Sequence, residues 1–172
     1  MSDYNKDRSW SDMFIPEIKR IVGPHLLDVA PFEIDAKRAA DLIILRARDL
    51  NIACRVRRKG FLPAFAYEFT IRSARDSGAD TELKKMVNGF GDWMFYGHAK
   101  EDHLTYFARW MLIDLSAWRA HLIMRTQKRL SISDLDEIPN RDGTFFRPFD
   151  IRSFIGEPNI LIASGDLLEN AA

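Results

Sequence analysis

The chain has 172 residues, of which 47% are apolar and 29% are charged. This length and composition favour one domain, residues 1–172, with enough interior to fold without disulfide or metal staples. Its 25 basic and 25 acidic side chains balance, so a global electrostatic attraction to nucleic acid is excluded. Any binding of nucleic acid must therefore come from a local concentration of charge.

Cys54 is the only cysteine, which rules out an intramolecular disulfide and favours a reducing, cytoplasmic setting. The first twelve residues are polar and lack the apolar segment of a signal peptide. The longest apolar runs are four residues, as in Leu42–Leu45, which is too short to cross a membrane. We expect a cytoplasmic protein without a membrane partner.

The N-terminal part predicts one amphipathic helix. Residues 1–10 are expected to be mobile, and Ser11 or Asp12 can cap a helix over Asp12–Val22. Its apolar positions recur at helical spacing, and Gly23 ends it. Glu17 lies at the border of this apolar stripe, where it points either toward a site or into solvent.

Three strands are expected next, at Asp41–Leu45, Ile52–Arg57 and Tyr67–Arg72, because these runs are rich in β-branched and aromatic residues. They predict an antiparallel meander. Its geometry would gather Asp41, Arg55, Arg57 and Glu68 at one edge. Such a group is either a functional site or a network of salt bridges.

The remaining elements complete a mixed α/β fold of the α+β type. We expect a helix capped by Asp80 or Thr81, a strand over Tyr106–Leu115, and a helix capped by Ser116. The core then covers residues 12–128, and residues 131–172 are expected to wrap it as an irregular extension. The aromatic tract Gly89–Gly97 supplies either core packing or stacking surfaces for unpaired bases.

The region from Lys37 to Arg75 is locally basic, with ten basic and three acidic residues. The basic residues that we expect to contact the phosphates of DNA or RNA are Arg55, Arg57, Arg58 and Lys59. Lys84 and Lys85, near the start of the next helix, are further candidates. A solvated helical face explains these two lysines equally well.

This order of elements resembles that of the PD-(D/E)XK, or restriction-endonuclease-like, nucleases. In that family an early Asp and an acid-x-Lys triplet hold Mg²⁺, often with a helical Glu nearby. Asp41 resembles the first acid, Glu68 the second, and Glu17 the helical carboxylate. The sequence departs from the family at Thr70, which stands in the lysine position, with Arg72 next on that strand face. A looser resemblance to phage-encoded proteins implies no activity.

The resemblance implies Mg²⁺-dependent cleavage of a phosphodiester, with Asp41 and Glu68 as metal ligands. Arg72 or Arg57 would then stabilise negative charge, although an arginine cannot act as a base. The alternative is a non-catalytic module that binds nucleic acid or inhibits a protein partner through the same basic strands. A third interpretation makes the arginines and carboxylates internal support of an interaction protein.

Overall fold

The computed structural model describes residues 3–29, 42–44, 50–75, 78, 80–140, 142–154, 157 and 159–165. The chain divides into two compact units, Met1–Leu50 and Asn51–Ala172. Each unit is described by itself below. The organisation of the whole chain as a single domain stays a prediction.

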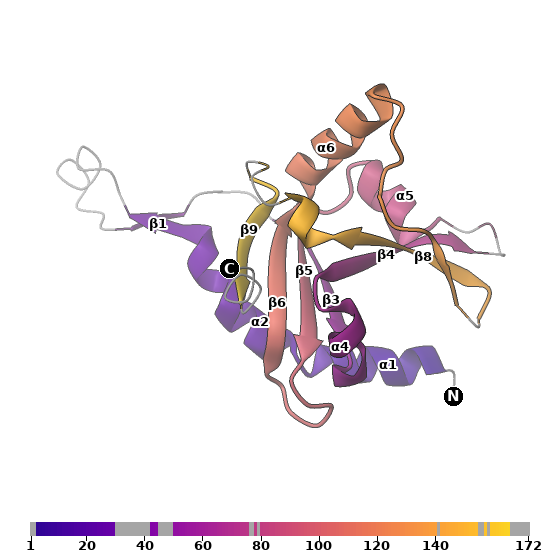
Figure 1. Ribbon diagram of the computed structural model, residues 1–172. Coiled ribbons are helices and arrows are strands. Elements are labelled where there is room, and N and C mark those ends of the chain that lie inside the picture. Colours follow the sequence, from indigo (N-terminus) through magenta and orange to yellow (C-terminus); the bar gives the residue numbers. More distant parts are fainter. Residues whose placement is uncertain are drawn as a thin grey trace. The chain divides into compact units, whose positions relative to one another are not determined.

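Among its described residues, the first unit contains helices α1 and α2 and a two-stranded sheet (Figure 1). Helix α1 covers Asp3–Asp12, where no ordered element was expected, and α2 covers Ile15–Val22. A proline at the start of α2 fits, because the first turn of a helix needs no N–H donor there. The predicted helix is therefore confirmed from Ile15 onward, but neither Ser11 nor Asp12 caps it.

The apolar stripe of α2 is buried, as its spacing indicates. Phe14, Ile18 and Val22 are at most 4% exposed. A short helical turn, η1 (Gly23–Leu26), follows α2. Strand β1 (Leu27–Val29) then pairs antiparallel with β2 (Leu42–Ile44).

The second unit is built on two sheets that cross one another (Figure 1). The four-stranded sheet has the order β3-β5-β6-β9, in which β3 and β5 are parallel and the other pairs antiparallel. Its strands are β3 (Ile52–Arg57), β5 (Trp93–Ala99), β6 (Phe107–Asp114) and β9 (Leu161–Gly165).

The three-stranded sheet is antiparallel, with the order β4-β8-β7. Its strands are β4 (Glu68–Arg75), β7 (Ile138–Pro139) and β8 (Thr144–Asp150). In the part of this unit that the structure describes, four short helical elements and one longer helix connect the strands. They are η2 (Lys59–Phe61), α4 (Leu62–Phe65), α5 (Glu82–Val87), α6 (Leu115–Gln127) and η3 (Ile151–Phe154).

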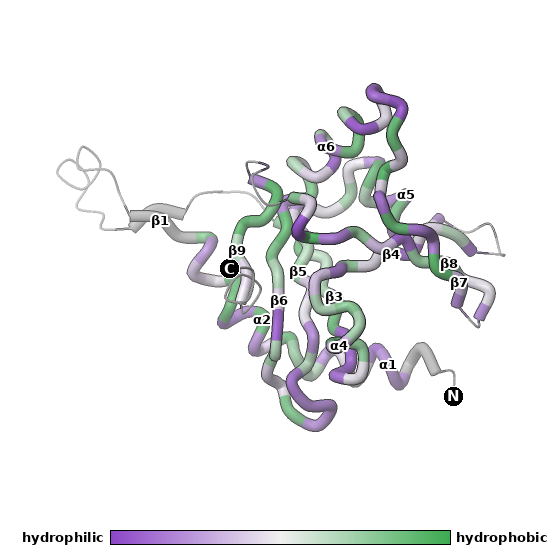
Figure 2. Tube along the Cα trace, in the orientation of Figure 1, coloured by the Kyte–Doolittle hydropathy of each residue, from purple (hydrophilic) through white to green (hydrophobic). Residues whose placement is uncertain are grey.

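Residues from both sheets and from α6 form one hydrophobic core. Phe69 of β4 stacks on Phe149 of β8 with ring centroids 5.2 Å apart, and Trp118 of α6 packs edge-on against Phe149. Hydrophobic stretches of β6 and β9 are visible as green segments in Figure 2. A Cβ at Gly97 would lie 2.6 Å from the Phe107 ring, so β5 passes this ring only because it carries a glycine there.

The mixed α+β class is confirmed, but the meander is wrong. Strands β2, β3 and β4 belong to three different sheets. The connection between β3 and β4 contains η2 and α4 rather than a tight turn, so it does not force the two strands to pair. Strand β3 pairs instead with β5, in which every residue is buried. A parallel pair needs a long crossover, and β4 and α5 lie within it.

The irregular C-terminal extension is also wrong. Strand β8 occupies the centre of the three-stranded sheet, and β9 forms an edge of the four-stranded sheet. The prolines and glycines of this region interrupt the sequence pattern without preventing strand formation. Pro148 lies within β8, and Gly165 ends β9.

Two helix starts follow the expected capping chemistry. Thr81 caps α5 by accepting a hydrogen bond from the Lys84 amide at 3.2 Å, as predicted. Asp114, rather than Ser116, caps α6, because its carboxylate accepts hydrogen bonds from the backbone amides of Ser116 and Ala117. No helix within the described ranges is long and apolar enough to cross a membrane.

Candidate functional site

Three arginines of the second unit gather around one aromatic ring. Arg55 and Arg57 come from β3 and Arg72 comes from β4, and we call them the arginine cluster. Their guanidinium carbons lie 5.3, 5.3 and 5.4 Å from the centroid of the Phe146 ring. The shared ring confirms that Arg55 and Arg57 point to the same side of β3, as strand alternation predicts.

Arg55 is the member of the arginine cluster that has a carboxylate partner. Its Nη2 lies 2.8 Å from Oε2 of Glu82 on α5, and its Nη1 donates to the Thr70 carbonyl at 3.0 Å. Burial lowers the pKa of Arg55, and the charge of Glu82 opposes that shift. This pair therefore provides internal support for the structure.

Arg57 is held by hydroxyl groups. Its Nε donates to the Tyr96 hydroxyl at 2.8 Å, and its Nη2 donates to Oγ1 of Thr70. The Thr70 and Tyr96 hydroxyls also lie 3.1 Å apart. Thr70, which stands where the resembled family has its lysine, is thus a buried link between these two side chains.

Arg72 is the third member of the arginine cluster, in which one ion pair to a carboxylate is found among the described residues. Its backbone amide donates to Oε2 of Glu82 at 3.3 Å, while its side-chain Nε is buried without a hydrogen-bond partner. Among the ion pairs of the described residues, the pair of Glu82 with Arg55 is the one that joins a carboxylate to a guanidinium of the cluster. The arginine cluster therefore carries a net positive charge.

A pocket of about 410 Å³ adjoins this region at the start of β3 and along α5. Ile52, Ala53 and Met86 line its apolar part, and Phe90 lines it while keeping 68% of its surface exposed. Its polar lining consists of Asn51, Arg75, Asp80, Glu82 and Lys85, with Gly91 beside them. We call it the Phe90 pocket.

The charges in the Phe90 pocket are unequal. Glu82 is paired with Arg55, and Asp80 is paired with Lys84 at 2.6 Å. No ion pair between described residues engages Arg75 or Lys85, both of which are exposed. The pocket thus combines an exposed aromatic ring with two cations that form no ion pair among the described residues. Glu82 connects it to the arginine cluster.

Glu68, the predicted second metal ligand, begins β4 and lies opposite Asp150 on β8. Burial and the neighbouring Asp150 raise the pKa of Glu68, while Arg152 acts in the opposite direction. Arg152 donates from Nε and Nη2 to the Asp150 carboxylate at 2.6 to 3.1 Å. Glu68 is therefore near a second carboxylate, but that carboxylate is already neutralised.

Two other predicted catalytic residues, Asp41 and Glu17, belong to the first unit, whereas Glu68 belongs to the second. Asp41 lies outside the described residues, so its place relative to Glu68, Arg55 and Arg57 stays a prediction. Glu17 accepts two hydrogen bonds from Arg20, at 2.7 and 2.8 Å, and this contact lowers the pKa of Glu17. No group of three His, Cys, Asp or Glu side chains suited to a metal ion occurs in the part of the chain that the structure describes.

Three of the predicted phosphate contacts are neutralised by acidic neighbours. Lys59 pairs with Glu101 at 2.7 Å, and Arg58 lies 3.9 Å from Asp102. Lys84 pairs with Asp80. Lys85 and Arg57 are thus the predicted phosphate contacts that lack a carboxylate partner among the described ion pairs.

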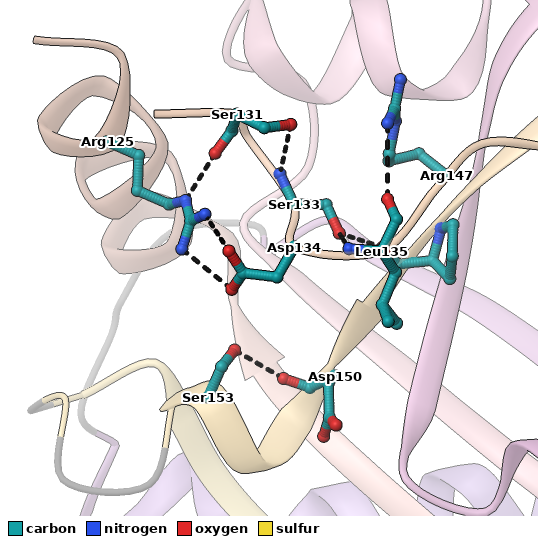
Figure 3. A network of polar contacts seen from close by, with 9 residues as sticks. Arg125, Ser131, Ser133, Asp134, Leu135, Arg147, Asp150 and Ser153 are labelled. Atoms are coloured by element: carbon teal, nitrogen blue, oxygen red, sulfur yellow. Dashed lines mark hydrogen bonds and ion pairs between the residues drawn. The ribbon is translucent and has the colours of Figure 1, made fainter. Parts of the chain in front are cut away.

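A second, smaller cavity of about 130 Å³ lies between α6, the segment after it and β8 (Figure 3). Arg125 donates there to the Ser131 carbonyl at 2.6 Å and to the Asp134 carboxylate. Ser133 donates to the Pro148 carbonyl and accepts from the Leu135 amide. These polar groups satisfy one another, so the network connects the segment to the sheet and α6.

Sequence reasoning missed Phe146, Glu82 and Phe90 as members of the site. Phe146 lies in the region predicted to be irregular, and Glu82 resembles an ordinary first-turn residue of a helix. The sequence pattern places Phe90 among the apolar positions of the predicted helix that Asp80 or Thr81 caps. The Gly89–Gly91 pair was the available signal, because a chain that turns at two glycines with positive φ cannot continue the helix that would bury Phe90.

Comparisons with protein-family models, with curated proteins and with solved structures find no match to this chain. The geometry of the described residues therefore carries the functional argument.

Proposed function

We propose that this protein binds single-stranded nucleic acid without cleaving it, and that the Phe90 pocket receives an unpaired base. The observation that supports this most directly is the exposed Phe90 ring beside Arg75 and Lys85, neither of which forms an ion pair with a described carboxylate. Proteins that bind single strands combine these two features, a stacking surface and nearby cations.

The dimensions and charges of the pocket suit this ligand. Its volume of about 410 Å³ falls within the range of roughly 300 to 1,000 Å³ that is usual for small-ligand sites. Arg57 and Arg72, which form no ion pair among the described residues, add positive potential beside Arg55, the partner of Glu82 in the pocket. A duplex does not offer an unstacked base, so the proposed site favours single strands.

The first prediction concerns the stacking surface. Replacing Phe90 with Ala should weaken the binding of a short single-stranded oligonucleotide by about tenfold or more, because one base loses its aromatic partner. Fluorescence anisotropy at low salt measures this change. Val87→Ala is the control, since Val87 is an exposed apolar residue at the end of α5, three positions before Phe90, and does not line the pocket.

The cations give a second readout in the same experiment. Replacing Arg75 and Lys85 together with Gln should lower the slope of log affinity against log salt by about 0.7 for each lost phosphate contact. Lys84→Gln should change it less, because Asp80 already neutralises Lys84. Equal effects of Lys84 and Lys85, or no binding at low salt, would contradict the proposal. Either result would favour a protein partner on this surface.

The second candidate function is the Mg²⁺-dependent phosphodiester cleavage implied by the family resemblance. The observation in its favour is the closeness of Glu68 to Asp150, which raises the pKa of Glu68. The described residues alone do not fit Mg²⁺, because both oxygens of Asp150 are bound by Arg152. This candidate therefore depends on Asp41.

Cleavage assays decide between the two candidates. If Asp41 and Glu68 are metal ligands, Asp41→Asn and Glu68→Gln should each abolish Mg²⁺-dependent cleavage while the protein stays folded, and a chelator should act likewise. Gel assays with single- and double-stranded DNA and RNA, in Mg²⁺ or Mn²⁺, measure the activity. A parent protein that binds oligonucleotides but leaves all four intact would end the nuclease hypothesis.

A further inference from the structure

Three basic side chains form a row across the four-stranded sheet. Arg57 on β3 is the register partner of His98 on β5, and His98 is the register partner of Arg109 on β6. Register partners on neighbouring strands project to the same face of a sheet, so the three side chains lie side by side. We call them the Arg57–His98–Arg109 row.

The centre of this row is buried and incompletely hydrogen-bonded. His98 is 1% exposed, and the Glu68 main chain is the one hydrogen-bonding group that reaches its ring among the described residues, so at least one ring nitrogen has no partner there. Nη1 of Arg109 is also buried and unpartnered there. Buried polar groups usually have hydrogen-bond partners, and a group left without one destabilises the fold, so neighbouring unpartnered groups indicate a missing ligand.

Aromatic groups, rather than carboxylates, hold the two arginines in place. The Arg109 guanidinium lies 4.8 Å from the centroid of the Tyr67 ring, and Arg57 donates to the Tyr96 hydroxyl. The described ion pairs include none to Arg57 or to Arg109. Both residues are half-buried, so solvent reaches the ends of the row.

The groups that face His98 are all basic or neutral. Arg57 and Arg109 flank it on β3 and β6, the Tyr96 ring packs edge-on at 5.7 Å, and the Glu68 main chain approaches from β4. Burial, followed by the charges of the two arginines, lowers the pKa of His98 to about 4. The imidazole is therefore neutral at neutral pH and can gain a proton when an anion enters.

We propose that the Arg57–His98–Arg109 row is a binding site for a phosphate group. Guanidiniums and an imidazole N–H supply several donors to one tetrahedral oxyanion, and two fixed positive charges favour it. The row goes beyond the Phe90 pocket, since the pocket residues Phe90 and Lys85 do not belong to it. Its phosphate is either free in solution or the terminal phosphate of a nucleic-acid strand.

Inorganic phosphate tests the site directly in the parent protein. Added at constant pH, between pH 5 and 7, it should move the NMR signals of the His98 ring toward those of the protonated form, in a saturable way. It should also raise Tm more than chloride does at equal ionic strength. Unchanged His98 signals, or a response equal to that of chloride, would overturn the proposal.

Variants then locate the phosphate. Arg109→Gln and His98→Gln should each weaken phosphate binding by about tenfold or more. Arg152→Gln is the matched control, because Arg152 also lies over the Tyr67 ring, at 4.6 Å, but is paired with Asp150. An equal loss in the Arg152 variant would overturn the proposal, since the effect would then reflect general charge.

Oligonucleotides identify the source of the phosphate. A strand with a 5′-terminal phosphate that outcompetes the same strand without it, and loses this advantage in Arg109→Gln, identifies a strand terminus as the ligand. Inorganic phosphate that binds while both strands bind equally identifies the free ion. Phe90→Ala should leave phosphate binding intact, so failure of the Phe90 pocket and failure of the row are separate results.

Discussion

Replacing Glu82 with Gln should lower the free energy of unfolding by about 3 kcal/mol, because it leaves the partly buried Arg55 without a counter-charge. The side chains of Arg55 and Glu82 are only 20% and 28% exposed. The variant would also leave three guanidiniums around Phe146 with no described carboxylate among them. Urea unfolding at neutral pH measures the loss.

The chain offers a closely matched control for this effect. Asp80 pairs with Lys84 at 2.6 Å, but both side chains are more than half exposed. Asp80→Asn should therefore cost less than about 1 kcal/mol, as is usual for surface pairs. A Glu82 variant no less stable than the Asp80 variant would contradict the assignment of internal support to the Arg55–Glu82 pair.

A double variant separates the pair from its surroundings. Replacing Arg55 and Glu82 together with Met removes both charges and leaves neither unpaired. This variant should lose less stability than Glu82→Gln alone, since apolar residues can replace a buried ion pair at little cost. A larger loss would indicate that Arg55 stabilises the fold mainly through the Thr70 carbonyl and the Phe146 ring.

Most strands could be predicted from sequence because their signals are local. The run Ile52–Arg57 matches β3 at both ends, and Tyr106–Leu115 contains all of β6. The partners of the strands could not be predicted in the same way. Pairing depends on which surfaces are buried together. The sequence analysis predicts no strand over the residues of β5, so it predicts no parallel partner for β3.

The candidate site was predictable to a similar extent. Strand alternation placed Arg55 and Arg57 on one side of β3, and the lysine position of the resembled family directed attention to Thr70. Neither sequence pattern shows which residue accepts a hydrogen bond from a guanidinium. Glu82 and Phe146 reach Arg55 from α5 and β8, far away in the sequence, and only tertiary packing brings these elements together.

The expected role of the aromatic tract was resolved by burial. Trp93, Phe95 and Tyr96 are at most 6% exposed, so they serve as core rather than as stacking surfaces. Phe95 packs between Phe107 and Trp110, with ring centroids 5.1 and 5.9 Å away. A sequence pattern shows how many aromatic residues a segment contains but not which of them are covered by other elements. Phe90 belongs to the same tract, yet 68% of its surface is exposed.

The pH dependence of stability should report on His98. Because the pKa of His98 falls from 6.5 to about 4 on folding, the unfolded chain binds more protons than the native protein between these two values. Stability from this group is therefore complete above pH 6.5 and is lost as the pH falls toward 4. The shift corresponds to about 3 kcal/mol at most.

Carboxylates titrate in the same pH range, so the decisive quantity is the difference between parent and variant. In the parent, the free energy of unfolding should fall more steeply between pH 6.5 and pH 4 than in His98→Gln, which has no ionisable group at this position. His103→Gln, the same substitution at an exposed histidine, controls for the number of histidines. Urea unfolding at several pH values measures the three slopes. Equal slopes in the parent and the His98 variant would show that the imidazole is not held neutral by burial and by Arg57 and Arg109. The electrostatic basis of the phosphate row would then be wrong.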